Sequence, residues 1–212
     1  MSFLPDPTAF TAFLLAAFLV GVAPGPGMFF AVGRGLSSDV SVTIIAVLGL
    51  ATASFVNCLV AATGLAALLA VNPVTFIVVK YLGAAYLVYL AFRALRDQGN
   101  GGDANDVQGK RREAWQSYRQ GFITNILNPK SAFFYLAFVP QFTDPSRGSV
   151  FAQFIILGLI FNVLGNNINL FFALMARRIS LSTLRNPRTQ KIRNWLTATI
   201  FAGIALHLVN SS

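Results

Sequence analysis

The chain has 212 residues, of which 55% are hydrophobic and 11% are charged. This composition lies well outside the balance of soluble globular domains, so we expect a protein whose solvent is the lipid bilayer. The net charge of +9 does not indicate nucleic acid, because most of the 16 Lys and Arg residues fall in two segments, 93–119 and 177–193, and no basic face of a soluble domain is visible.

Stretches without charge recur along the chain, and they are long enough to cross a bilayer as helices. The longest, 40–79, is divided at Asn72-Pro73, because proline disfavours helix in the residue before it. The first stretch is expected to stay in the mature protein, since the residues before it carry Asp6 and no cation, unlike a signal peptide. The expected fold is an all-α integral membrane protein with six transmembrane helices, at about residues 8–32, 41–70, 74–95, 119–141, 150–175 and 194–210.

The first of these helices is expected to be broken. Its sequence contains Pro24-Gly25-Pro26-Gly27, which removes two backbone donors and supplies two residues that adopt positive φ readily. A helix restarting near Gly27 would point unpaired N–H groups and a positive dipole end at the break, which suits an anionic group such as a carboxylate. The alternative is a proline kink that serves packing alone.

The fourth helix is expected to be broken as well. Asn125 and Asn128 are three residues apart and share a helix face, Pro129 opens the next stretch, and Lys130 places a cation inside an apolar run. In the alternative interpretation Lys130 reaches the membrane surface, but it lies eleven residues past Arg119, about half a span, so this reach would be strained. Two broken segments in corresponding positions of two halves indicate a transport site.

Four asparagines crowd the fifth helix. Asn162 and Asn166 are four residues apart on one face and are the candidates for a transport pathway, whereas Asn167 and Asn169 are equally well explained as hydrogen bonds between helices. No Asp or Glu lies inside any expected span, and His207 is the only histidine. Enzymes and metal sites need clustered ligands or a paired nucleophile and base, so we expect no enzyme, no metal and no cofactor.

The charges also predict a topology. Placing both cation-rich segments in the cytoplasm satisfies the positive-inside rule, and six spans then put both termini outside. The hydrophilic linker 97–112 is expected to be a flexible cytoplasmic loop between a first three-helix repeat, 1–96, and a second, 113–212. Each repeat has an odd number of crossings, so homologous halves would form an inverted repeat with their two breaks near the midplane.

These motifs resemble the lysine/homoserine exporter superfamily (LysE/RhtB) of bacterial amino-acid efflux proteins, and the resemblance covers nearly the whole chain. It is carried by Pro24 to Gly27, by Gly83 to Leu90, and by Gly121 through Asn128-Pro129-Lys130 to Phe142. The family often has Asn or Asp directly after Pro-Gly-Pro. Here Gly27 stands at that position and offers no side chain to a ligand or a coupling ion.

The resemblance implies export of amino acids or close derivatives from the cytoplasm, by exchange with protons, through the inner membrane of a bacterium. A neutral, zwitterionic substrate fits best, because no Asp or Glu inside the expected spans could pair with the side chain of a cationic amino acid. Asp39 and His207 are the candidates for proton coupling, and the spacing of small residues would permit a homodimer. The competing interpretation is a passive channel or a membrane scaffold in which the helix breaks serve packing.

Overall fold

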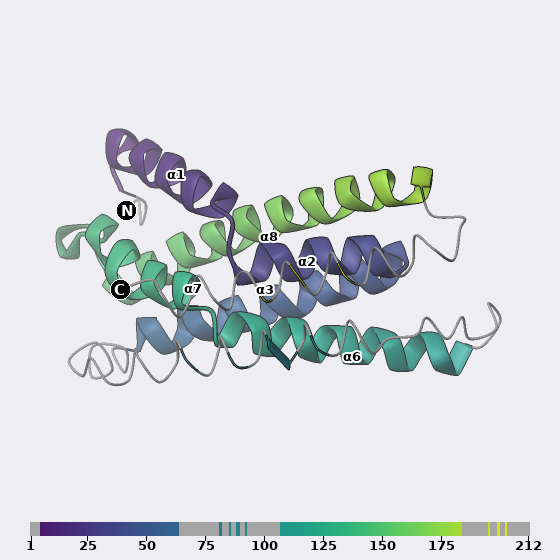
Figure 1. Ribbon diagram of the computed structural model, residues 1–212. Helices are drawn as coiled ribbons and strands as arrows, with labels where there is room; N and C mark the ends of the chain where they lie inside the picture. Colours follow the sequence, from purple (N-terminus) through teal and green to yellow (C-terminus); the bar gives the residue numbers. More distant parts are fainter. Residues whose placement is uncertain are drawn as a thin grey trace.

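The computed structural model describes residues 5–63 and 107–183, together with the isolated helical residues 81, 85, 88, 89, 92, 195, 199 and 202. Within these residues every regular element is helical, and no strand occurs (Figure 1). The expected helices at 74–95 and 194–210 and the residue His207 lie largely or wholly outside the described residues. In chain order the elements are α1 (Pro7–Val22), α2 (Pro26–Ser37), α3 (Val40–Ala62), α6 (Val107–Ile126), α7 (Pro129–Phe133), the π-helix η1 (Phe134–Phe138), the 3-10 turns η2 (Val139–Phe142) and η3 (Pro145–Arg147), and α8 (Val150–Thr183).

Two described helices, α3 and α8, are each long and apolar enough to cross a membrane. Helices α1 and α2 pass the same test only when taken together, and they are bent by 53° at the residues between them. Helix α6 begins at Val107, so residues 107–112 of the expected loop are helical. Helix α8 continues to Thr183, past the expected end of its span at residue 175.

Local sequence explains where α1 begins. The Asp6 carboxylate accepts hydrogen bonds from the backbone N–H groups of Thr8 and Ala9, each at 3.0 Å, and Pro7 occupies the first helical position, where an N–H is not needed. The bond from Ala9 is the main reason that the pKa of the Asp6 carboxyl lies below its ordinary value. The start of α1 is therefore fixed by one acidic cap.

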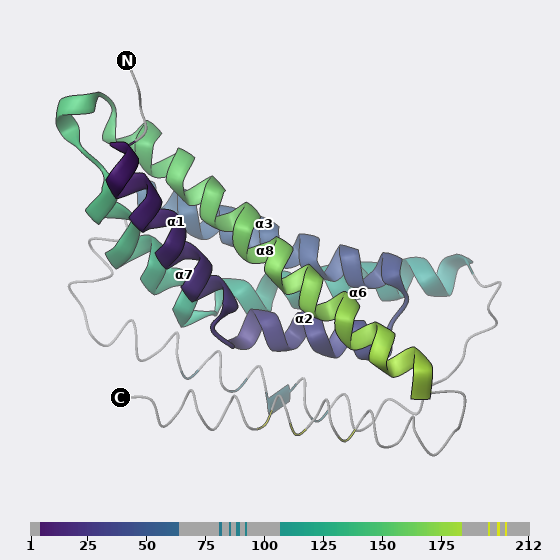
Figure 2. The ribbon, with the colours of Figure 1, turned by 90° about the horizontal axis from the view of Figure 1, so that it is seen from above.

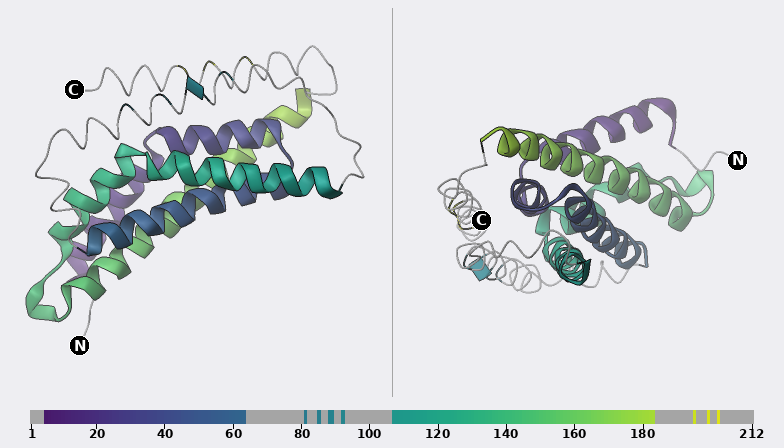
Figure 3. Two further views of the ribbon diagram at one scale, coloured as in Figure 1. Left: turned by 90° about the horizontal axis from the view of Figure 1, so that it is seen from below. Right: turned by 90° about the vertical axis from the view of Figure 1, so that its right-hand side faces the viewer.

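The described helices form a bundle in which α3 runs along α6, while α8 crosses α2 and α3 and also contacts α1 (Figures 2 and 3). Glycines bring the backbones of α3 and α6 into contact. A Cβ added at Gly49 would lie 2.2 Å from the Tyr118 carbonyl oxygen, and one at Gly121 would lie 2.3 Å from that of Ala46. Gly49 therefore allows the close contact between α3 and α6 within one chain.

An apolar cluster holds the segment that follows α7. Tyr135 and Phe134 of η1 are almost fully buried, and the Tyr135 hydroxyl lies 2.8 Å from the Ser54 hydroxyl of α3. Cys58 is fully buried in this cluster as a free thiol. The buried members of the cluster are Phe13, Ala17, Cys58, Phe134, Tyr135, Val139, Phe154, Leu157 and Phe161.

Candidate functional site

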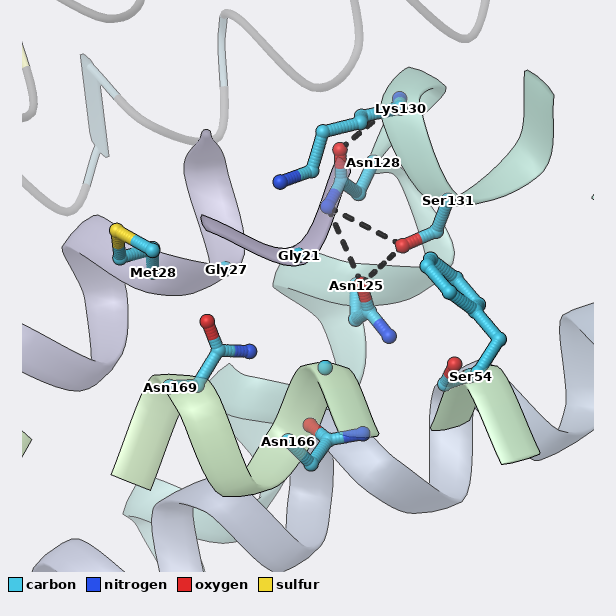
Figure 4. Close-up of a pocket in the computed structure, with 12 residues that line it drawn as sticks. Gly21, Gly27, Met28, Ser54, Asn125, Asn128, Lys130, Ser131, Asn166 and Asn169 are labelled. Atoms are coloured by element: carbon cyan, nitrogen blue, oxygen red, sulfur yellow. Dashed lines mark hydrogen bonds between the residues drawn. The ribbon is translucent and has the colours of Figure 1, made fainter. Parts of the chain in front are cut away.

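The two helix interruptions lie next to each other in the fold. Helix α1 ends at Val22 and α2 begins at Pro26, while α6 ends at Ile126 and α7 begins at Pro129. The Lys130 ammonium reaches from the second interruption to the first (Figure 4). Its Nζ donates to the carbonyl oxygens of Val20, at 3.0 Å, and Ala23, at 2.7 Å.

The chemistry of proline explains why these carbonyls are available. In a continuous helix the Val20 carbonyl would accept from the backbone N–H of residue 24, but Pro24 has none. Carbonyls at a helix C-terminus also carry the negative end of the helix dipole, which favours a cation. A Cβ at Gly25 would lie only 3.2 Å from Lys130 Cε, so glycine at this position leaves room for the lysine.

The second interruption is organised by Asn125 and Asn128. Asn128 caps α7, because its Oδ1 accepts from the Lys130 backbone N–H at 3.1 Å. Asn125 Oδ1 accepts from the Ser131 hydroxyl at 2.9 Å and from Asn128 Nδ2 at 3.2 Å, and Asn125 Nδ2 donates to the Leu50 carbonyl of α3 at 2.8 Å. Asn125 therefore joins α3, α6 and α7 at the break.

A small polar cavity lies between these groups and α8 (Figure 4). Its volume is about 30 Å³, which is room for water and much too little for an amino acid. In this conformation the site is too small for a substrate. The residues that line it are Gly21, Gly27, Met28, Ser54, Asn125, Asn128, Lys130, Ser131, Phe161, Gly165, Asn166 and Asn169.

Lys130 also lines a second, more open cavity of about 360 Å³. Its walls are almost entirely apolar and include Phe133, Phe134 and Phe138 from α7 and η1. Val20 and Ala23, whose carbonyls receive the Lys130 ammonium, also line this cavity. The ammonium thus lies at the boundary between a polar space and an apolar one.

The structure brings together most of the residues that sequence reasoning selected. Those that line the polar cavity are Gly27, Asn125, Asn128, Lys130 and Asn166. Those that shape the breaks beside it without lining it are Pro24, Gly25, Pro26 and Pro129. Asn162 does not line the cavity itself: its Nδ2 donates to the Ala51 carbonyl of α3 at 3.0 Å, and its Oδ1 accepts from Nδ2 of the lining residue Asn166 at 2.7 Å.

Sequence reasoning missed several lining residues. The sequence leaves the role of Asn169 open between packing and the pathway, and the structure places it in the cavity lining, three positions after Asn166. Ser131 follows Asn128 at the same spacing. Ser54 has no sequence signal, because it lies on α3 and meets the site only through tertiary packing.

Asp39 lies away from the cavity. It precedes α3, is exposed, and pairs with Arg177 of α8 at 3.4 Å. Arg177 also donates to the Ser38 carbonyl, and the Ser38 hydroxyl lies 2.8 Å from the Glu113 carboxylate of α6. These contacts tie α3, α6 and α8 together at the end of α2.

Apolar helices of membrane-spanning length and a polar site buried between helix breaks define an all-helical, multi-pass membrane protein. The sequence model of the family described as "LysE type translocator" matches residues 18–212. The chain therefore belongs to this family, as the sequence motifs predicted. Membership of this family points to a transporter and not to an enzyme.

Several relatives are similar over almost their whole length. A leucine efflux protein of Klebsiella pneumoniae is 28% identical over 94% of this chain and 93% of the relative, and one of Enterobacter sp. is 26% identical over 95% of each. An uncharacterized membrane protein of Vibrio cholerae is 28% identical over 94% of this chain and 96% of the relative. No significant match to a solved structure was found.

Proposed function

We propose that this protein is a secondary transporter that exports neutral amino acids or close derivatives from the bacterial cytoplasm across the inner membrane. The observation that carries the proposal is the meeting of two helix breaks around a buried polar cavity, with Lys130 bonded across them. Membership of the translocator family supports transport. Two relatives named leucine efflux protein support an amino acid, and leucine is a neutral one.

The proposed architecture is six transmembrane helices arranged as a 3+3 inverted repeat. Helices α1 and α2 would form the broken first span, and α6, α7 and η1 the broken fourth span. The repeats would comprise residues 1–96 and 113–212, joined in the cytoplasm by residues 97–112, of which 107–112 belong to α6, with both termini outside. The 53° bend between α1 and α2 and the interruption at Asn128 support this arrangement.

The site has groups for both charges of a zwitterion. Helix α2 starts with Pro26, and its cap residue Gly25 has no side chain, so the N–H groups of Gly27 and Met28 are available to a carboxylate. Carbonyl oxygens of α1 and the side-chain oxygens of Asn166 and Asn169 can accept from an ammonium group. The cavity must widen before a substrate fits.

Gly27 provides a test of this site. Its Cα faces the cavity, and a Cβ would lie 3.6 to 3.8 Å from its neighbours, which is ordinary contact. We therefore expect Gly27→Ala, whose single methyl group makes only these contacts, to fold and to lower leucine efflux from preloaded cells. Gly27→Val adds two further methyl groups and is expected to abolish efflux in cells that hold the wild-type amount of protein in the membrane. Ala12→Val is the control, because it also introduces a valine, at an exposed position of α1 that does not line the cavity. Full efflux by Gly27→Val would contradict the proposed site.

Proton exchange is the proposed energy source. Asp39 is the candidate carrier within the described residues, on the basis of its charge and its partner Arg177, and His207 is the candidate outside them. Leucine efflux from cells is expected to stop when an uncoupler collapses the proton gradient. Undiminished efflux of leucine against its concentration gradient under that treatment would contradict proton exchange.

A further inference from the structure

The carbonyl oxygens of Val20 and Ala23 form a binding site for a primary ammonium group. They project from the last turn of α1, where the helix has ended and the partner position for Val20 is a proline. Both accept from one ammonium, that of Lys130, at 3.0 and 2.7 Å. An ammonium carries three donors, so this geometry satisfies two of them and leaves one for a further acceptor.

The occupant of this site comes from the other half of the chain. Lys130 extends from the first turn of α7 across to α1 (Figure 4). Among the described residues no Asp or Glu lies within ion-pair distance of its Nζ, and the acceptors of its hydrogen bonds are carbonyls. Uncharged acceptors hold a cation less firmly than a carboxylate does, so another ammonium group can compete for them.

The same ammonium lies where a substrate's ammonium would be needed. Lys130 lines both the polar cavity, which Gly27 and Met28 of α2 also line, and the apolar cavity of about 360 Å³. A neutral amino acid with its ammonium on Val20 and Ala23 could direct its carboxylate toward α2 and its apolar side chain into the space lined by Phe133, Phe134 and Phe138.

We propose that Lys130 is a tethered substitute for the substrate's ammonium. In the substrate-free protein Lys130 occupies the Val20 and Ala23 carbonyls, and in the loaded protein the substrate's primary ammonium takes its place. The inference rests on the proposed transport function. Its consequence is that Lys130 allows the carrier to change conformation without substrate, because the carbonyls freed by the break keep a donor inside the membrane.

Measuring net efflux and exchange of leucine separately distinguishes a Lys130 that replaces the substrate's ammonium from a Lys130 that binds the substrate directly. Net efflux into leucine-free buffer requires the empty carrier to return, whereas exchange of labelled for unlabelled leucine does not. In liposomes containing the purified full-length protein, we expect Lys130→Ala to lower net efflux about tenfold or more, from the loss of charged hydrogen bonds. Exchange should stay close to the wild-type rate.

Chemical rescue provides the matched control. Lys130→Ala removes the atoms of n-propylamine, so n-propylammonium should restore net efflux in the variant, while tetramethylammonium, which has no N–H, should not. Equal loss of exchange and net efflux in a folded variant would overturn the proposal, as would retention of both. Absence of exchange by the wild-type protein would instead overturn the proposed transport function.

A measurement on the wild-type protein avoids any variant. If leucine displaces Lys130 from its carbonyls, saturating leucine should increase acetylation of Lys130 by a membrane-permeant reagent, read by mass spectrometry against the exposed Lys110. Unchanged or decreased labelling of Lys130, in protein that exchanges leucine, would overturn the displacement.

Discussion

Gly121→Ala is expected to lower the stability of the protein by about 1–3 kcal/mol, the range typical of overpacking in a filled interior. The added Cβ would lie 2.3 Å from the Ala46 carbonyl oxygen, which is backbone and cannot turn aside. Helices α3 and α6 would have to separate, and the break that holds Asn128 and Lys130 begins at the end of α6. The measurement is the midpoint of thermal unfolding in detergent.

Gly165→Ala is the control for this substitution, because it adds the same methyl group where nothing lies within 4 Å. The Gly165→Ala midpoint should equal or exceed that of the wild-type protein, because alanine favours a helix interior over glycine. Equal midpoints for Gly121→Ala and Gly165→Ala would show that α3 and α6 do not approach as closely as the structure has them.

Asn125→Leu is expected to be more damaging still, at about 2–4 kcal/mol, since several buried hydrogen bonds are lost together. The Asn125 side chain is 5% exposed, donates to the Leu50 carbonyl and accepts from Asn128 and Ser131. A leucine of similar size fills the space, but the Leu50 carbonyl, Asn128 Nδ2 and the Ser131 hydroxyl each lose the hydrogen bond that they make to Asn125. Thermal unfolding and leucine exchange should both be impaired.

Asn167→Leu provides the comparison for Asn125→Leu. Asn167 is exposed, and its Nδ2 donates within its own helix to the Val163 carbonyl at 2.7 Å. Its replacement should shift stability by about 0.5 kcal/mol or less, as is usual for exposed positions. Comparable destabilisation by the two substitutions would contradict the central place of Asn125 in the break.

The features that depend on local chemistry could be predicted from the sequence. Proline removes a backbone donor wherever it occurs, so the positions of Pro24 and Pro129 in the chain are enough to locate the two interruptions. Lys130 could be selected because a cation inside an apolar run demands a partner. The identity of that partner could not be predicted, since it lies in α1, more than one hundred residues away in the chain.

The roles of the α8 asparagines were beyond sequence reasoning for a similar reason. A spacing of three or four residues defines a shared face, but the neighbour of that face depends on how the helices pack. Asn162 meets the Ala51 carbonyl of α3, whereas Asn169, which the sequence explains equally well by packing, lines the polar cavity. Ser54 could not be predicted for the same reason, because it reaches the cavity only through the packing of α3.

Counterflow of leucine through the purified wild-type protein tests the central claim most directly. Liposomes loaded with a high concentration of unlabelled leucine are diluted into a trace of labelled leucine. A carrier with an alternating site is expected to accumulate label transiently above the external concentration, and Gly27→Val is expected to accumulate none. Simple equilibration of label would indicate a passive channel, and no movement would indicate a scaffold; either result would contradict transport through the site between the two helix breaks.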